Sequence, residues 1–119
     1  MRACGYSGGV PAGVTTEFLP DYALVTISGE VAIAIADDVA LALREATADG
    51  RVVVDLRKTT FMGSTGVNLL VAAYNAVRRR NGWLRLVYDG DPVARVLRIT
   101  GLIDLLPAYD SVAAAAGDG

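Results

Sequence analysis

The sequence predicts a single α/β domain built on a mostly parallel mixed β-sheet with covering helices. A length of 119 residues suits one hydrophobic core. Strand-like and helix-like segments alternate along the chain, which is typical of a parallel sheet. Residues 51–56 place valines at consecutive positions, a pattern of strands buried on both faces. No repeat or linker-like stretch divides the sequence, so we expect one domain.

Runs of β-branched and aromatic residues, bounded by turn-forming residues, predict five strands. The second run contains Tyr22, Val25 and Ile27, and Gly29 is expected to end it. The run at 51–56 is expected to lie inside the sheet. The predicted strands cover residues 14–19, 22–28, 51–56, 83–88 and 103–106.

Apolar residues that recur every three or four positions predict four helices. The clearest helix begins near Ser64, and Val67, Leu70 and Val77 lie on one side of it. Asp37 or Asp38 is expected to cap the first helix. The predicted helices cover 37–49, 64–80, 93–100 and 111–116, which gives the order β-β-α-β-α-β-α-β-α. The domain is expected to span 14–116, with a flexible N-terminal arm over 1–13 and a frayed C-terminal tail over 117–119.

Composition excludes several classes of function. There is no histidine and one cysteine, Cys4, so neither a Ser-His-Asp nucleophile nor a Cys-His zinc site can form within the chain. We therefore expect no enzyme activity, no metal and no cofactor. The net charge of −2 argues against general nucleic-acid binding. The basic run Arg78–Arg80 closes a predicted helix, where cations complement the helix dipole.

Hydropathy predicts a cytoplasmic protein without a membrane partner. No apolar run approaches the roughly 18 residues that a membrane-spanning helix needs. The first residues, Met-Arg-Ala-Cys-Gly-Tyr, lack the apolar core of a signal peptide.

The segment that joins the third strand to the clearest helix carries the candidate site. Its centre, residues 63–66, reads Gly-Ser-Thr-Gly. A helix N-terminus offers unpaired N–H groups and a partial positive charge, so it stabilises a phosphate on a serine placed there. The simpler interpretation is that Ser64 only caps the helix, and chemistry alone favours this interpretation.

The segment 61–67, Phe-Met-Gly-Ser-Thr-Gly-Val, resembles the hallmark of the STAS domain family, in which a hydrophobic pair precedes Asp-Ser-Ser-Gly or Asp-Ser-Thr-Gly. Three further segments resemble landmarks of that family in the same order: 27–31 (Ile-Ser-Gly-Glu-Val), 53–56 (Val-Val-Asp-Leu) and 98–102 (Arg-Ile-Thr-Gly-Leu). The resemblance covers about residues 14–116 and is strongest to the anti-sigma factor antagonists.

This resemblance implies a partner-switching function. The unmodified antagonist binds an anti-sigma factor that is also a serine kinase, and thereby regulates sigma-factor-dependent transcription. The kinase phosphorylates the hallmark serine, here Ser64, and a phosphoserine phosphatase reverses the modification. Thr65 is the alternative acceptor at the same helix start. The implied partner-binding residues are Glu30, Ala32, Met62, Gly63, Ser64, Thr65, Gly66 and Asn68.

The sequence departs from the family pattern at two positions. Gly63 replaces the usual aspartate before the serine, and Ala32 replaces an acidic residue two positions after Glu30. These losses motivate an alternative function, a STAS-type scaffold or sensor that binds proteins or a small anionic ligand without phosphorylation. Arg57 and Lys58 are interpreted as solvated loop charges, with contact to a phosphate or nucleotide on the partner as the alternative. A monomer or a weak dimer is expected.

Overall fold

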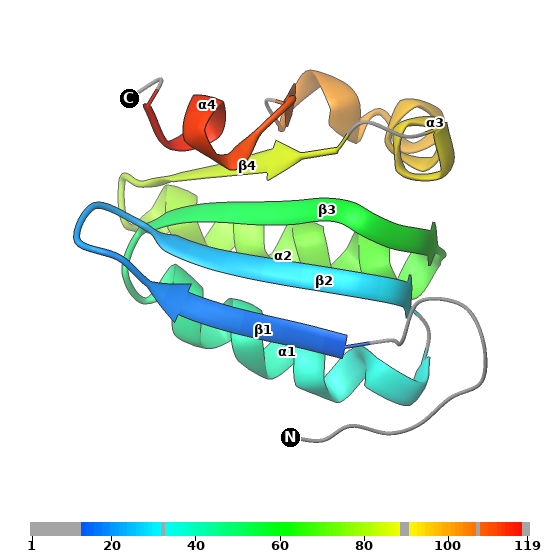
Figure 1. Ribbon diagram of the computed structural model, residues 1–119, viewed down its shortest axis with the longest axis horizontal. Coiled ribbons are helices and arrows are strands. Elements are labelled where there is room, and N and C mark those ends of the chain that lie inside the picture. The colour runs from blue at the N-terminus through cyan, green and yellow to red at the C-terminus, as the bar shows by residue number, and fades with distance from the viewer. Residues whose placement is uncertain (1–12, 32, 89–90, 107, 118–119) are drawn as a thin grey trace.

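The computed structural model describes residues 13–31, 33–88, 91–106 and 108–117. Its centre is one five-stranded sheet in the order β1-β2-β3-β4-β5, in which β1 is antiparallel to β2 and every other pair is parallel (Figure 1). The predicted mostly parallel mixed sheet is therefore confirmed. The strands are β1 (Gly13–Phe18), β2 (Ala23–Val31), β3 (Arg51–Met62), β4 (Trp83–Val87) and β5 (Ala108–Tyr109).

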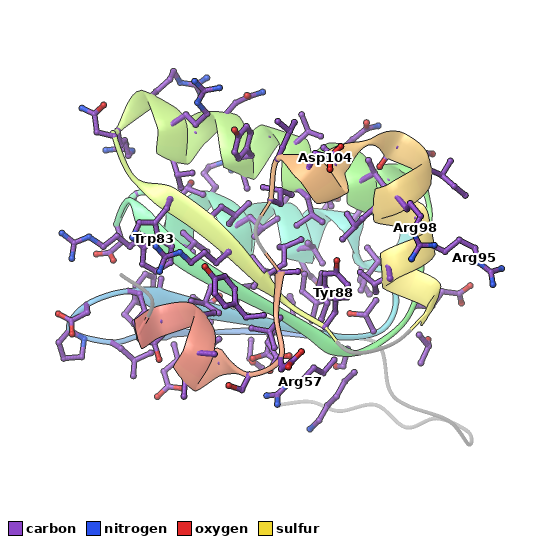
Figure 2. All side chains as sticks on the ribbon, turned by 90° about the horizontal axis from the view of Figure 1, so that it is seen from above. Arg57, Trp83, Tyr88, Arg95, Arg98 and Asp104 are labelled. Carbon is purple, nitrogen blue, oxygen red and sulfur yellow. The ribbon has the colours of Figure 1, made fainter. Side chains whose placement is uncertain are left out.

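Three of the four helices cover one face of the sheet. Alternate residues of β2 and β3, such as Ile27 and Val54, pack with Leu43 of α1, Leu70 of α2 and Leu97 of α3 in one core. Figure 2, seen from above, shows α2 and α4 on opposite sides of the sheet. The helices are α1 (Ile33–Thr47), α2 (Ser64–Arg79), α3 (Asp91–Thr100) and α4 (Val112–Gly117), with a short 3-10 helix, η1, at Leu102–Asp104.

The opposite face of the sheet has a second, smaller cluster beneath α4. Val53 and Val87 are buried there with Ala115 of α4. The side chain of Val53 therefore lies on this face of the sheet, whereas that of its neighbour Val54 lies in the main core on the other face. The Arg85 guanidinium lies 3.9 Å from the centre of the Trp83 ring. The same guanidinium donates a 2.8 Å hydrogen bond to the carbonyl of Ala115. α4 is therefore held to β4 by one arginine as well as by apolar contact.

β2 and β3 both extend further than the sequence predicts. Gly29 does not end β2, because its φ of 79° accommodates a shift of register next to Glu30. β2 then continues to Val31, and its pairing carries β3 to Met62. The residues predicted as a loop after 56 are therefore part of a strand.

Two helical predictions also need correction. α1 begins at Ile33, one turn before Asp37 and Asp38, because Ile35 already packs against the core; both aspartates are exposed inside the helix and do not cap it. The strand predicted at 103–106 is wrong. A 3-10 helix begins at Leu102 instead; Leu102 and Leu106 are buried in the core, and the short strand β5 follows at Ala108.

At the amino end of the parallel strands, α2 turns sharply into β4. Asn81 has a φ of 59°, and the N–H of Gly82 donates to the carbonyl of Val77. A Cβ atom at Gly82 would lie 1.7 Å from the Gly50 carbonyl oxygen. Only glycine permits this close approach. Within the described part of the chain, no helix has the length and apolar character to cross a membrane.

Candidate functional site

The candidate site lies where parallel strands β2 and β3 end together. Glu30 pairs in register with Phe61, and Val31 pairs with Met62. Figure 1 shows both strands pointing to the end of the sheet at which α2 starts. Ser64 follows Met62 by two residues, so Glu30 and Ser64 share this carboxyl edge of the sheet.

Gly63, and not Ser64, is the residue that caps α2. The backbone of Gly63 is extended, and its carbonyl accepts the first helical hydrogen bond, 3.1 Å from the N of Val67. No side chain donates or accepts a capping hydrogen bond. The interpretation of Ser64 as a cap is therefore wrong, because the helix begins at Ser64 itself. The N–H groups of residues 64–66 precede the first helical bond and have no carbonyl partner within α2.

The two hydroxyls at the start of α2 differ in accessibility. Ser64 is exposed, whereas Thr65 is half-buried and Gly66 is buried. Asn68 is also exposed, and it follows Ser64 by one turn on the same side of the helix. The exposed surface at this point is thus made by Ser64 and Asn68, with Glu30 exposed at the end of β2.

Arg57 lies on β3 and is paired with a carboxylate. Its Nε and Nη2 donate to Oδ1 and Oδ2 of Asp55 at 3.0 and 2.9 Å, and its backbone N–H donates to the same Oδ1 at 3.0 Å. Figure 2 shows Arg57 on the side of the sheet opposite α2. The prediction that Arg57 lies in a loop is wrong, because it belongs to β3; its side chain is exposed, as predicted, and Asp55 orients its guanidinium.

The Asp55 carboxyl is stabilised in its ionised form. Burial acts to raise its pKa, but the hydrogen bonds from the side chain and backbone of Arg57 lower it, as do the charges of Arg57 and Lys58. The lowering effects are larger, so the pKa lies below the ordinary value of 3.8. This pair supports β3 rather than the surface around Ser64.

A buried hydrogen bond near the site had no signal in the sequence. The hydroxyl of Thr59, which is buried, donates to the carbonyl of Ile27 at 2.9 Å. It connects β3 to β2 at the first of the two register shifts that precede Glu30, which lies between Thr26 and Ser28. Its effect is to fix the strand that carries Glu30 against the strand that leads to Ser64.

Two further predicted site residues, Ala32 and Met62, lie at the ends of the strands that form the site or directly after them. Ala32 lies outside the described residues, as do Cys4, most of the predicted N-terminal arm and the last two residues of the predicted tail. The backbone of Met62 ends β3. In the described ranges no three residues of the types His, Cys, Asp and Glu are grouped so that they could hold a metal ion.

Comparison with known proteins defines the class. The STAS domain family model matches residues 14–115, so this chain belongs to the STAS domain family. Among the proteins it resembles is the anti-sigma F factor antagonist of Paenibacillus polymyxa, which is 28% identical over 91 residues, covering 74% of this chain and 78% of the relative.

Solved structures agree with this assignment. An anti-sigma factor antagonist from Mycobacterium paratuberculosis matches with a TM-score of 0.80 and 26% identity, over 92% of this chain and 93% of its own. The Bacillus cell fate determinant SpoIIAA in its phosphorylated form matches with a TM-score of 0.71 over 90% of this chain and 100% of its own. At 15% identity, the latter likeness concerns the fold.

Proposed function

We propose that this chain is an anti-sigma factor antagonist that binds an anti-sigma factor of the serine-kinase type and is released when Ser64 is phosphorylated. The observation that carries the proposal is the exposed hydroxyl of Ser64 at the first position of α2, on the edge of the sheet that also presents Glu30. The names of its relatives, and a phosphorylated structure among its structural neighbours, support the same function. The domain would act as a substrate and a binding module, with no catalysis of its own.

The start of α2 suits a phosphate. A phosphoserine carries about −1.5 to −2 charges at neutral pH. The N–H groups of residues 64–66 have no partner within the helix, and the helix dipole places a partial positive charge at the same point. A phosphate at Ser64 is therefore stabilised in the free domain.

The same phosphate disrupts a docked partner. Asn68 and Glu30 extend the exposed surface around Ser64, and a new dianion in such an interface introduces repulsion and a desolvation cost. A phosphoserine phosphatase that removes the group would restore binding. The proposed cycle places both states in the cytoplasm and requires neither nucleic acid nor a membrane.

The missing acidic residue at Gly63 offers a direct test of how the site selects its partner. Gly63 has a φ of −96°, so a side chain fits its backbone conformation. We expect Gly63→Asp to increase the rate of phosphorylation, because it restores the charge typical of the family. Gly63→Asn is the matched control, since asparagine caps a helix as well as aspartate does but adds no charge. Equal rates for the two variants would show that the added charge has no role.

Mass spectrometry of the intact protein tests the function itself. The chain would be incubated with ATP and each candidate serine kinase of the anti-sigma type, alongside Ser64→Ala and Thr65→Val. We expect one phosphate on the wild type and on Thr65→Val, and none on Ser64→Ala. Phosphate on Ser64→Ala but not on Thr65→Val would transfer the site to Thr65.

The second candidate function is an unphosphorylated scaffold or sensor. Gly63 and Ala32 favour it, because neither supplies the carboxylate usual at its position. A candidate kinase that binds the chain tightly but adds no phosphate would support this function. Ser64→Ala and Ser64→Glu would then bind that partner equally well, whereas the phosphorylation switch requires Ser64→Glu to bind more weakly.

A further inference from the structure

A groove runs between α1 and α2 on their outer side, away from the sheet. It has a volume of about 330 Å³, and alanines form much of its lining, with Leu43 and Ala73 buried between the helices. A second hollow of about 450 Å³ continues it toward the ends of both helices and shares Arg44, Thr47 and Ala76 with it. The two hollows therefore form one surface, the α1–α2 groove.

Small side chains make this surface unusual for the outside of a helix pair. Ala72 is exposed, and Ala40 and Ala76 are half-buried. Alanine at these positions lets another backbone come close to both helices, as small residues do where helices pack closely. The lining extends over residues 69–79 of α2, roughly 16 Å of helix, and includes Arg80 directly after it.

Positive charge is concentrated at one end of the groove. Arg44, Arg79 and Arg80 line the second hollow and are all exposed. Nearby Glu45 and Asp49 form no ion pair with them, since the ion pair found across the described part of the chain is Asp55 with Arg57. The two helix C-termini contribute about half a negative charge each, and no acidic side chain lines the second hollow, so its lining is positively charged. The helix dipoles explain why arginines occur there but do not neutralise them.

We infer that the α1–α2 groove binds an amphipathic helix of a partner protein, with the apolar side of that helix on the alanines and acidic residues against Arg44, Arg79 and Arg80. The concave shape and the charge at one end select this occupant. An anionic membrane is the less suitable occupant, because a flat lipid surface would reach the arginines but not the lining between the helices. This inference does not depend on the proposed function at Ser64, which lies before the first lining residue of α2, Leu69.

Titration with a defined peptide tests the inference. The probe is a helix of about 16 residues, closed by one lactam bridge because short helices are marginal alone. It carries leucines on one side and glutamates in its last two turns, and a second peptide carries lysines in place of the glutamates. We expect saturable binding of the acidic peptide, with amide chemical-shift changes confined to residues 40–48 and 69–80. The lysine peptide should bind at least about tenfold more weakly.

Matched variants locate the binding. Arg44→Glu combined with Arg79→Glu should weaken binding of the acidic peptide by at least about tenfold. Arg95→Glu combined with Arg98→Glu is the control of equal charge change, because both arginines are exposed on α3 and neither lines the groove (Figure 2). Ala72→Gln should also weaken binding by adding bulk to the groove, and Ala113→Gln, at an exposed position of α4, should not.

Three results would overturn the inference. The first is no saturable binding of the acidic peptide by folded wild-type protein. The second is equal binding of the acidic and lysine peptides, or shifts outside the groove. The third is sedimentation of the protein with vesicles of anionic phospholipid when the acidic peptide does not bind, which would assign the arginines to a membrane.

Discussion

The two faces of the sheet are supported in different ways. On the face under α1, α2 and α3, valines and leucines from the strands and from these three helices form one continuous core. The face under α4 has a small apolar cluster, a guanidinium stacked on Trp83, and the Asp55–Arg57 ion pair. The first face supplies bulk hydrophobic stability, and the second adds local contacts whose strength depends on charge and geometry.

The two faces should differ most in the free energy of unfolding that is lost when a buried apolar side chain is shortened. Leu70 of α2 is 1% exposed in the main core, so Leu70→Ala should lower the free energy of unfolding by about 3–4 kcal/mol. Val112 of α4 is half-buried, and Val112→Ala should cost about 1 kcal/mol. Urea denaturation measures both. Similar losses in the free energy of unfolding at Leu70 and Val112 would show that the two faces stabilise the fold equally.

The next effect should come from the turn through which α2 reaches β4. Gly82→Ala would place a Cβ against the Gly50 backbone, which cannot rotate away as a side chain can. We expect a loss of about 2–3 kcal/mol in the free energy of unfolding. Gly13→Ala in β1 is the control, because its Cβ would meet no atom within 4 Å. Thermal denaturation of both variants would show whether the loss of stability comes from the clash with Gly50 or from replacing a glycine in general.

The face under α4 should make the stability of the fold depend on pH, because it contains the Asp55–Arg57 ion pair. The pKa of Asp55 is lowered in the folded protein, so its ionised form adds stability at neutral pH that is lost as the pH falls through 3.8 and below. Asp55→Asn should reduce stability at about pH 7 and flatten its decline toward about pH 3. The same substitution at exposed Asp38 controls for loss of one charge. Parallel pH curves for Asp55→Asn and the wild type would contradict the pairing.

The smallest effect should occur at Ser64, which belongs to neither face. Its side chain makes no capping bond, so Ser64→Ala should change the free energy of unfolding by less than about 0.5 kcal/mol. A true cap would cost about 1 kcal/mol when removed. Urea denaturation therefore distinguishes a structural serine from one retained for modification.

The regular parts of the fold could be predicted because their patterns are local. The spacing of Val67, Leu70 and Val77 predicts α2 to within one residue of its end, and those side chains do face the core. Consecutive valines at 52–54 predict a strand buried on both faces, and all three are fully buried. In each case the residues that form the element also determine its environment.

The strand ends and the bonding of the site depend on residues far apart in the sequence. β2 passes through Gly29 because β3 continues beside it, and β3 passes Arg57 for the same reason. The position of Ser64 could be predicted, since the hallmark segment follows a buried strand. The cap at Gly63, the Asp55–Arg57 pair and the Thr59 bond could not, because each depends on backbone geometry that composition does not specify.

The arginine that holds α4 has a consequence for hydrogen exchange. α4 has six residues, too few to be a stable helix alone, and its links to the sheet are a small apolar cluster and the bond from Arg85 to Ala115. Its amides should therefore exchange by a local opening that leaves the main core intact, well before those of β3 or α2. We therefore expect α4 to open and close as a separate unit while the surface around Ser64 stays folded.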